Sequence, residues 1–348
     1  MRAGPGAWVA RRRYFAQIVR RRRLHTNEER EDRMRYMVTG GAGFIGSHTV
    51  DELVRRGHEV IVLDDLSTGK VENLTGAISK IKFVQESVVD LEALQHACRD
   101  VDCIIHLAAQ TSVPRSIADP VETHLINANG TLNVLIAARE AKVKRVVFAC
   151  TCAVYGKTAA LPITESAALE PISPYGVSKQ MGEAYGRVFR DLYSVEFISL
   201  RYFNVFGPRQ DPGSPYSGVL SVFNEHLLKG KTPTVYGDGE QSRDFVYVEN
   251  VVHANLLAAE ITSGSFQAIN VGTGSRTTLN HTLKLLESIT SRPAKANYAH
   301  AREGDIRDSQ ADISLATATL GYHPHVTFEE GLKRTWEWFS LNERAPLR

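Results

Sequence analysis

The stretch Met37-Val38-Thr39-Gly40-Gly41-Ala42-Gly43-Phe44-Ile45-Gly46 decides the fold of this chain. A short β-favouring run, residues 35–39, leads into it, and residues 47–56 continue with apolar side chains at helical spacing until Gly57 ends the pattern. A strand that passes through a glycine-rich turn into a helix opens a dinucleotide-binding βαβ unit. The turn brings backbone close to a diphosphate, which then lies at the positive end of the helix dipole.

The second strand pattern indicates which dinucleotide binds. Residues 59–63 form a continuous apolar run typical of a buried strand, and Asp64 follows at once. An acidic residue at this strand tip accepts hydrogen bonds from the adenosine ribose and repels a 2′-phosphate, so we predict NAD rather than NADP. The polar turn over residues 64–70 is placed to wrap the adenosine. An ordinary αβ turn followed by a surface aspartate is the alternative.

Further strand patterns over residues 81–85, 101–107 and 143–150 alternate with helix patterns over residues 88–97 and 131–141. This regular alternation predicts an α/β fold, a doubly wound parallel Rossmann sheet with right-handed crossovers.

The length of 348 residues permits one large or two modest domains. We expect an NAD-binding Rossmann domain over residues 34–200. A smaller mixed α/β substrate domain should occupy residues 201–345, with some segments returning to the sheet. Hydrophobic residues at 43% and charged residues at 23% are typical of a soluble globular protein. No apolar run has the length of a membrane span, so we predict a cytoplasmic location and no membrane partner.

Charge is unevenly distributed along the chain. Residues 1–33 hold 10 arginines and 4 acidic residues, whereas the remainder holds 31 basic and 35 acidic residues. The mildly acidic body gives no sign of a nucleic-acid partner. The arginine-rich start is either an organelle transit peptide or an upstream-extended start, with Met34 as the true one; we favour the second. In both cases we expect a disordered extension outside the fold.

The four cysteines are expected to be buried, reduced thiols. Cys98, Cys103, Cys150 and Cys152 lie in apolar strand-like or helical contexts and form neither a zinc-ligand spacing nor a Cys-x-x-Cys pair. We therefore predict no metal site and a reducing compartment.

Candidate catalytic residues follow the fifth strand, because chemistry in open parallel sheets lies beyond the carboxyl ends of the strands. Thr151 ends that strand, and a helix beginning after Pro174 places Tyr175 and Lys179 four residues apart on one face. A nearby ammonium lowers the pKa of a phenol, and a phenolate removes the proton of a sugar hydroxyl while hydride leaves its carbon. A solvated helix face is the alternative. We expect His106, at the end of the fourth strand, to be a packed residue rather than a catalytic one.

At this point the chain resembles a known family. Gly40-x-x-Gly43-x-x-Gly46, Tyr175-x-x-x-Lys179 and Arg201-Tyr202-Phe203-Asn204-Val205-Phe206-Gly207-Pro208-Arg209-Gln210 resemble the extended short-chain dehydrogenase/reductases, and among them the UDP-glucose and UDP-N-acetylglucosamine 4-epimerases. The resemblance runs from about Met34 to beyond Trp336. It implies a homodimer formed through two helices, for which residues 117–141 and 175–193 are long enough.

The residue patterns and the resemblance together assign the two binding sites. NAD contacts are expected from Gly40, Gly43, Phe44, Ile45, Gly46, Asp64, Asp65, Ser67, Thr68, Gly69, Ser87, Val88, Leu107, Ala108, Ala109, Gln110, Tyr175, Lys179 and Phe203. Contacts to the UDP-sugar are expected from Arg115, Thr151, Tyr175, Asn204, Gln210, Gly218, Val219, Phe223, Val235, Arg243, Arg302, Asp305 and Ser309. The arginines suit a diphosphate because guanidinium donates paired hydrogen bonds.

The chain departs from the family pattern in informative places. Ser87-Val88 replaces a usual Asp-Ile pair near the adenine, and Thr151-Cys152-Ala153 replaces a serine-rich segment but keeps the hydroxyl. Related dehydratases and decarboxylases carry an acid where Ala153 stands, so its absence favours simple epimerisation. Ser309 stands where epimerases restricted to UDP-glucose often carry tyrosine, which leaves room for an N-acetyl group.

These observations predict a reversible, NAD-dependent 4-epimerisation of a UDP-hexose through a 4-keto sugar. UDP-N-acetylglucosamine and UDP-N-acetylgalactosamine are the expected pair, and UDP-glucose and UDP-galactose are further candidates. UDP-glucuronate 4-epimerase, UDP-xylose synthase and nucleotide-sugar 4,6-dehydratase remain alternatives on the same fold, as does a non-catalytic NAD-binding protein. The pathway, whether polysaccharide biosynthesis or galactose use, stays open.

Overall fold

The computed structural model describes residues 33–157, 160–211, 218–262, 267–301 and 306–343. The expectations for the extension over residues 1–33 lie outside these residues, apart from Arg33, and so do those for Arg302 and Asp305. Among the residues described, no helix combines the length and apolar character needed to cross a membrane.

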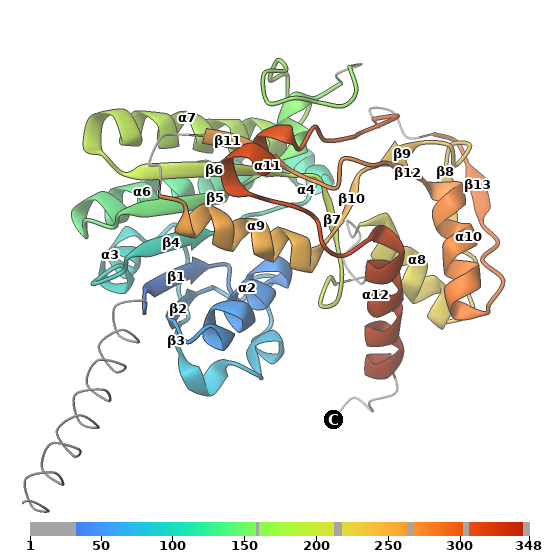
Figure 1. Cartoon of the computed structure of the whole chain (residues 1–348), viewed down its shortest axis with the longest axis horizontal. Coiled ribbons are helices and arrows are strands. Elements are labelled where there is room, and N and C mark those ends of the chain that lie inside the picture. The colour runs from blue at the N-terminus through green and yellow to red at the C-terminus, as the bar shows by residue number, and fades with distance from the viewer. Residues whose placement is uncertain (1–32, 158–159, 212–217, 263–266, 302–305, 344–348) are drawn as a thin grey trace, which may run out of the picture.

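A seven-stranded parallel sheet forms the centre of the described chain (Figure 1). Its strands are β1 (Arg35–Thr39), β2 (Glu59–Leu63), β3 (Ile81–Val84), β4 (Cys103–His106), β5 (Arg145–Thr151), β6 (Glu196–Tyr202) and β11 (Gln267–Val271). Their spatial order is β11-β6-β5-β4-β1-β2-β3. The order reverses between β1 and β4, which opens a crevice at the carboxyl ends of these strands. The predicted doubly wound Rossmann sheet is confirmed.

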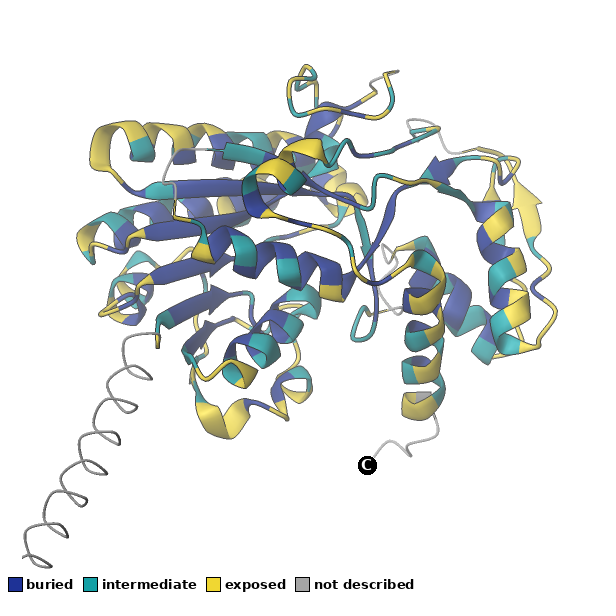
Figure 2. Cartoon of the chain, in the orientation of Figure 1, coloured by how far each residue is buried: buried dark blue, intermediate teal, exposed yellow. Residues whose placement is uncertain are grey.

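Helices cover both faces of this sheet. They are α2 (Phe44–Arg55), α9 (Val248–Glu260) and α11 (Ser314–Leu320) on one face, and α3 (Leu91–Ala97), α6 (Gly130–Glu140) and α7 (Pro174–Tyr193) on the other. Alternation along β1 divides the core accordingly: Tyr36 and Val38 pack with α2 and α9, whereas Met37 packs with α3 and α6. Figure 2 shows the sheet buried between these layers.

Local sequence sets where several helices begin. The helix expected from residue 88 begins instead at Leu91, because the Asp90 side chain accepts a hydrogen bond from the Ala93 amide and caps it. The stretch over residues 117–141 is not one helix. It comprises the end of α4 (Val113–Ala118), then α5 (Pro120–His124), a π-turn (Leu125–Asn129) and α6, with a break where Asp119 caps α5 and Pro120 begins it.

A second, smaller lobe follows β6 and lies to the right in Figure 1. Its strands are β7 (Asn204–Phe206), β8 (Thr234–Tyr236), β9 (Ser242–Arg243), β10 (Phe245–Tyr247), β12 (Thr277–Thr278) and β13 (Asn297–Ala299), and its helices are α8 (Val219–Leu228), α10 (Leu279–Thr290) and α12 (Phe328–Glu343). The fully buried Asp244 ties it to the end of β11: its carboxylate accepts hydrogen bonds from the backbone N–H groups of Thr273, Gly274 and Ala311.

A buried ion pair joins α7 to β6. The Arg201 guanidinium meets the Glu183 carboxylate through two hydrogen bonds of 2.7 and 2.9 Å, and both side chains are 4% exposed. Arg201 also donates to the Tyr155 hydroxyl (2.9 Å), which donates to Asn270 Oδ1 on β11 (2.6 Å). Although burial raises the pKa of Glu183, its hydrogen bonds and the charge of Arg201 outweigh this and lower it.

We expect Glu183→Gln to lower the free energy of unfolding by about 3–5 kcal/mol, because the Arg201 charge would stay buried without a counter-charge. Urea unfolding monitored by tryptophan fluorescence measures this. Glu330→Gln is the matched control, since it breaks an exposed pair with Arg334 and should cost less than about 1 kcal/mol. Equal losses in the two variants would contradict the prediction.

Candidate active site

The glycine-rich turn crosses the crevice between β1 and β4. Gly40 has φ +68°, and a Cβ there would lie 2.7 Å from the Ala108 nitrogen; a Cβ on Gly46 would lie 2.0 Å from the Gly40 oxygen. These two glycines are therefore required by the turn and by helix packing. At Gly43 a Cβ would meet only the Gly40 oxygen, at 3.2 Å. Gly43 leaves free the space that a diphosphate at the start of α2 needs.

Asp64 anchors the predicted adenosine loop to this turn. Its carboxylate accepts hydrogen bonds from the backbone N–H groups of Ala42 and Leu66, both 2.9 Å, and burial raises its pKa. A carboxylate offers about four acceptor positions, so capacity for ribose hydroxyls remains. Asp65, Ser67 and Thr68 lie exposed on the same loop.

At the end of β4, both ring nitrogens of His106 form hydrogen bonds within the protein. Its Nδ1 lies 2.7 Å from the Thr39 hydroxyl and its Nε2 lies 3.0 Å from the Thr131 hydroxyl. Because Thr131 donates to the Asn127 carbonyl oxygen, Nε2 carries the proton and Nδ1 accepts. Burial lowers the pKa of His106 to about 3. The histidine is packed and neutral, as expected from the sequence.

Residues just after β4 line the crevice with backbone. Leu107, Ala108 and Ala109 are half-buried there. Gln110 is buried and its Nε2 donates to the Thr123 hydroxyl (2.9 Å), so its side chain is engaged in a hydrogen bond within the protein. Val88, packed against α6, and Phe203, in the core, are also buried from solvent, as are Gly46, Asp64 and Lys179.

The start of α7 presents Tyr175 and Lys179 next to the end of β5. The Ser173 hydroxyl accepts from the Gly176 amide and fixes the first turn. Lys179 is 3% exposed and its ammonium donates to the Ala149 carbonyl oxygen at 2.9 Å. Burial lowers the pKa of Lys179 to about 8.

The expected lowering of the Tyr175 pKa by Lys179 is not found in the protein without its cofactor. The pKa of Tyr175 is raised by burial, and a hydrogen bond with Thr151 offsets this only in part. Lys179 does not lower it, because its ammonium is directed to a backbone carbonyl oxygen of β5. Thr151 therefore lies close to the phenol, where the predicted proton path places it.

A cavity of about 300 Å³ opens between β7, β8 and the start of α8. It is lined by Asn204, Val205, Phe206, Gln210, Gly218, Val219, Leu220, Thr234, Val235, Tyr236, Gln241, Arg243, Phe245 and Leu279. Six predicted UDP-sugar residues thus meet in one place. Two buried polar atoms within the described part of this lining, Asn204 Nδ2 and Gln241 Oε1, have no protein partner, so a donor and an acceptor remain for a ligand.

The cavity adjoins the catalytic strand end through Arg243. Its Nη1 donates to the carbonyl oxygens of Ser242 (2.9 Å) and Arg307 (3.0 Å). Burial raises the pKa of the Cys152 thiol to about 11, and the charge of Arg243 acts on the same thiol. Cys152 directly follows Thr151, so the arginine lies near the proton-transfer residues.

Five predicted substrate residues of the described chain do not line this cavity: Thr151 and Tyr175, at the end of β5 and the start of α7, and three others. Arg115 pairs with both carboxylate oxygens of Glu122, at 2.6 and 2.9 Å. Phe223 is fully buried in the core. Ser309 lies beside Ser242, 5% exposed, with a buried hydroxyl that has no partner in the described chain.

Sequence reasoning did not assign Gln241, Tyr236 or Asp244 to the site. Gln241 had a usable signal, since it stands two residues before Arg243 in the same turn. Asp244 had none, because its backbone partners come from distant segments.

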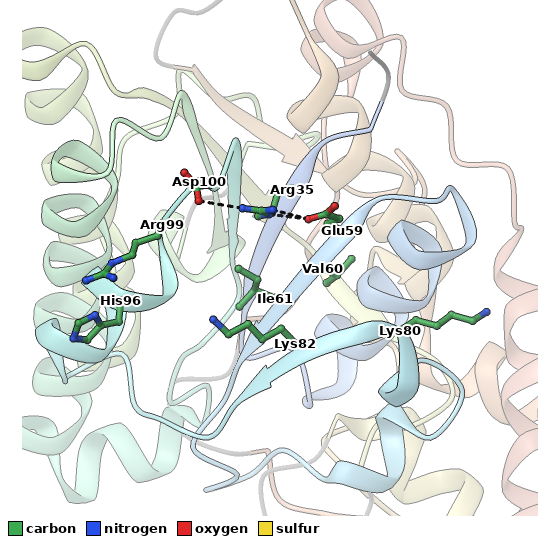
Figure 3. A pocket seen from close by; sticks show the side chains of 9 residues that line it. All are labelled: Arg35, Glu59, Val60, Ile61, Lys80, Lys82, His96, Arg99 and Asp100. Carbon is green, nitrogen blue, oxygen red and sulfur yellow. Dashed lines mark hydrogen bonds and ion pairs between the residues drawn. The ribbon is translucent and has the colours of Figure 1, made fainter. Parts of the chain in front are cut away.

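A second hollow, of about 610 Å³, lies at the opposite, amino-terminal edge of the sheet (Figure 3). Its central Arg35 is held between Glu59 (2.8 Å) and Asp100 (3.4 Å). Lys80 and Arg99 point away from this centre in Figure 3. Four basic and two acidic side chains line it, together with His96, and it lies at the opposite end of the strands from the crevice.

The model of the NAD dependent epimerase/dehydratase family matches residues 36–272, and the chain belongs to this family. NAD is therefore its cofactor, as predicted from Asp64. The chain is similar to three solved UDP-sugar 4-epimerases. That of Thermotoga maritima with UDP-glucose is 41% identical (89% of this chain, 100% of that one, TM-score 0.85). The UDP-N-acetylglucosamine 4-epimerase of Methanobrevibacter ruminantium, with UDP-N-acetylmuramic acid, is 39% identical (89% and 99%, TM-score 0.85). The UDP-glucose 4-epimerase of Thermus thermophilus with NAD is 39% identical (88% and 99%, TM-score 0.80).

Proposed function

We propose that this protein catalyses the reversible 4-epimerisation of UDP-hexoses, with both UDP-N-acetylglucosamine and UDP-glucose as substrates. The observation that carries the proposal is that Thr151, at the carboxyl end of β5, interacts with the half-buried Tyr175 at the start of α7. The charge of Arg243, from the cavity lining, acts on the adjacent Cys152. The similarity to solved UDP-sugar 4-epimerases supports it.

The residues of the crevice fit NAD: the glycine-rich turn would hold the diphosphate, Asp64 would hold the ribose, and the half-buried backbone after β4 would hold the nicotinamide ring. NAD supplies a hydride acceptor that later returns the hydride, and the cationic charge of its oxidised ring favours a phenolate nearby. Tyr175 takes the proton of the 4-hydroxyl, with Thr151 as relay. After the sugar has turned over, Tyr175 returns a proton to the oxygen on C4.

The UDP part of the substrate stays bound while the sugar turns over. Arg243 suits the diphosphate, and the first turn of α8, starting at Gly218, offers backbone N–H groups with the positive end of a helix dipole. The unpartnered atoms of Asn204 and Gln241 are placed to contact the nucleotide.

Tyr175→Phe should reduce turnover at least about a hundredfold, because no other group can take the 4-hydroxyl proton. UDP affinity should stay unchanged, since the phenol acts on the sugar. Coupled assays and UDP titration calorimetry measure the two quantities. Tyr193→Phe, at the far end of the same helix, is the control and should retain activity; a fully active Tyr175→Phe would contradict the mechanism.

Ser309 is proposed to leave room for an N-acetyl group. We expect the wild-type enzyme to convert UDP-N-acetylglucosamine and UDP-glucose to their 4-epimers without added NAD, as followed by proton NMR. Ser309→Tyr should lose the first activity and keep the second, whereas Ser309→Ala should keep both. Conversion of UDP-glucose alone by the wild type would refute this role of Ser309. Loss of carbon dioxide or water from a substrate would favour the decarboxylase or dehydratase alternatives, although Ala153 supplies no acid for them.

We also propose that the enzyme is a homodimer. Val177, Val188 and Leu192 form an exposed apolar stripe along α7, with 43%, 47% and 68% exposure, and the neighbouring α5 and π-turn expose Val121 and Leu125. Figure 2 shows exposed residues along the outer side of α7. Adjacent helices with apolar stripes pack well against a second copy.

Leu192→Arg should convert the dimer to a monomer, because the charge would be buried without a partner. Light scattering after size-exclusion chromatography gives the mass. Leu341→Arg, an equally exposed leucine on α12, should leave the mass unchanged. A wild-type monomer would refute the proposal.

A further inference from the structure

Residues 208–211, here called the strap, follow β7 at the start of the small lobe. Three side chains from the first βαβ unit hold it: His48 Nε2 donates to the Pro208 carbonyl oxygen (2.9 Å), Asp51 pairs with Arg209 (2.7 Å), and Lys70 pairs with Asp211 (3.0 Å). Three of the strap's four residues are thus bound by the cofactor-binding half of the chain.

The three holding residues follow the glycine-rich turn in the chain. His48 and Asp51 lie on α2, one and two turns after the glycine-rich turn. Lys70 ends the adenosine loop, and its backbone N–H donates to the Ala42 carbonyl oxygen of the glycine-rich turn (3.0 Å). The ammonium of Lys70 also donates to Asp211 of the strap. Lys70 therefore links both cofactor loops to the strap directly.

The fourth strap residue, Gln210, forms part of the wall of the nucleotide cavity. Its Nε2 donates to the Val205 carbonyl oxygen on β7 (3.2 Å), and its Oε1 accepts from the Ser221 hydroxyl on α8 (2.6 Å). A side chain on Gly218 would begin 3.2 Å from Gln210 Nε2. Gln210 thus sets the distance between β7 and the first turn of α8, the turn assigned to the diphosphate.

The backbone of the strap needs this support. Arg209 has φ +67°, a left-handed conformation that side-chain-bearing residues keep only when their surroundings hold them. The Asp51 carboxylate fixes its guanidinium. His48 is half-buried and neutral, with its pKa lowered by burial to about 4, which suits an N–H donor to the Pro208 carbonyl oxygen.

We infer that Asp51 and Lys70 are positioning residues for the nucleotide-sugar site, acting through the strap on Gln210 and the start of α8. Neither residue touches the nucleotide cavity. The inference rests on the proposed function, because it takes the ligand of that cavity to be a uridine diphosphate.

The test uses the enzyme with its NAD retained and UDP as the probe. Asp51→Asn and Lys70→Met should each weaken UDP binding in calorimetry by about threefold, and the double variant should weaken it further. The KM for the UDP-sugar should rise by the same factor with kcat unchanged, because the proton-transfer residues are untouched. Lys70→Arg, which keeps the cation, should restore binding.

Glu52→Gln is the matched control. Glu52 adjoins Asp51 on α2 but pairs with Arg55 and Arg56, away from the strap, so its loss should leave UDP affinity unchanged. Variants that bind UDP as the wild type does, or that lose kcat rather than affinity, would overturn the inference alone. A wild-type protein that binds no UDP would overturn the proposed function as well.

Discussion

The arrangement of the site depends on the buried ion pair between Arg201 and Glu183. Tyr175, Lys179 and Glu183 follow one another at four-residue spacing on α7, so the helix face that carries the base also carries the carboxylate that holds the helix in place. Arg201 lies on β6, whose chain continues almost at once into Asn204 of the nucleotide cavity. This buried ion pair thereby links the helix that carries Tyr175 and Lys179 to the strand that leads to the cavity lined by Asn204. Both partners must be present, since either charge alone would be costly at this depth.

Burial gives this region its electrostatic character. His106 is held neutral between two threonine hydroxyls, and Lys179 has its pKa lowered while it donates to a backbone carbonyl oxygen. The phenol of Tyr175 is protonated more strongly than in water. The protein by itself therefore keeps this phenol protonated. On the mechanism proposed above, the charge that favours the phenolate comes with the cofactor.

The sequence predicted the fold because its signals are local. The glycine-rich turn, Asp64 and the alternation of apolar runs each depend on neighbouring residues, and the sheet confirms them. The cavity residues Asn204 and Arg243 came from a family resemblance rather than from pattern. What the sequence could not show depends on distant partners. The carbonyl oxygen of Ala149 takes the Lys179 ammonium, and Glu122 takes Arg115. Neither pairing follows from spacing in the chain.

The strand β11 has a consequence for how the chain is made. It lies at the edge of the sheet, parallel to β6, but it follows β6 only after β7, α8, β8, β9, β10 and α9. During synthesis, β6 must therefore wait with its backbone hydrogen-bonding groups unpaired on one side until residues 267–271 emerge. An unpaired apolar strand is the kind of surface that chaperones protect and that nascent chains use to aggregate. This topology places part of the small lobe between two adjacent strands of the sheet. It therefore leaves one side of β6 unpaired for a period during synthesis.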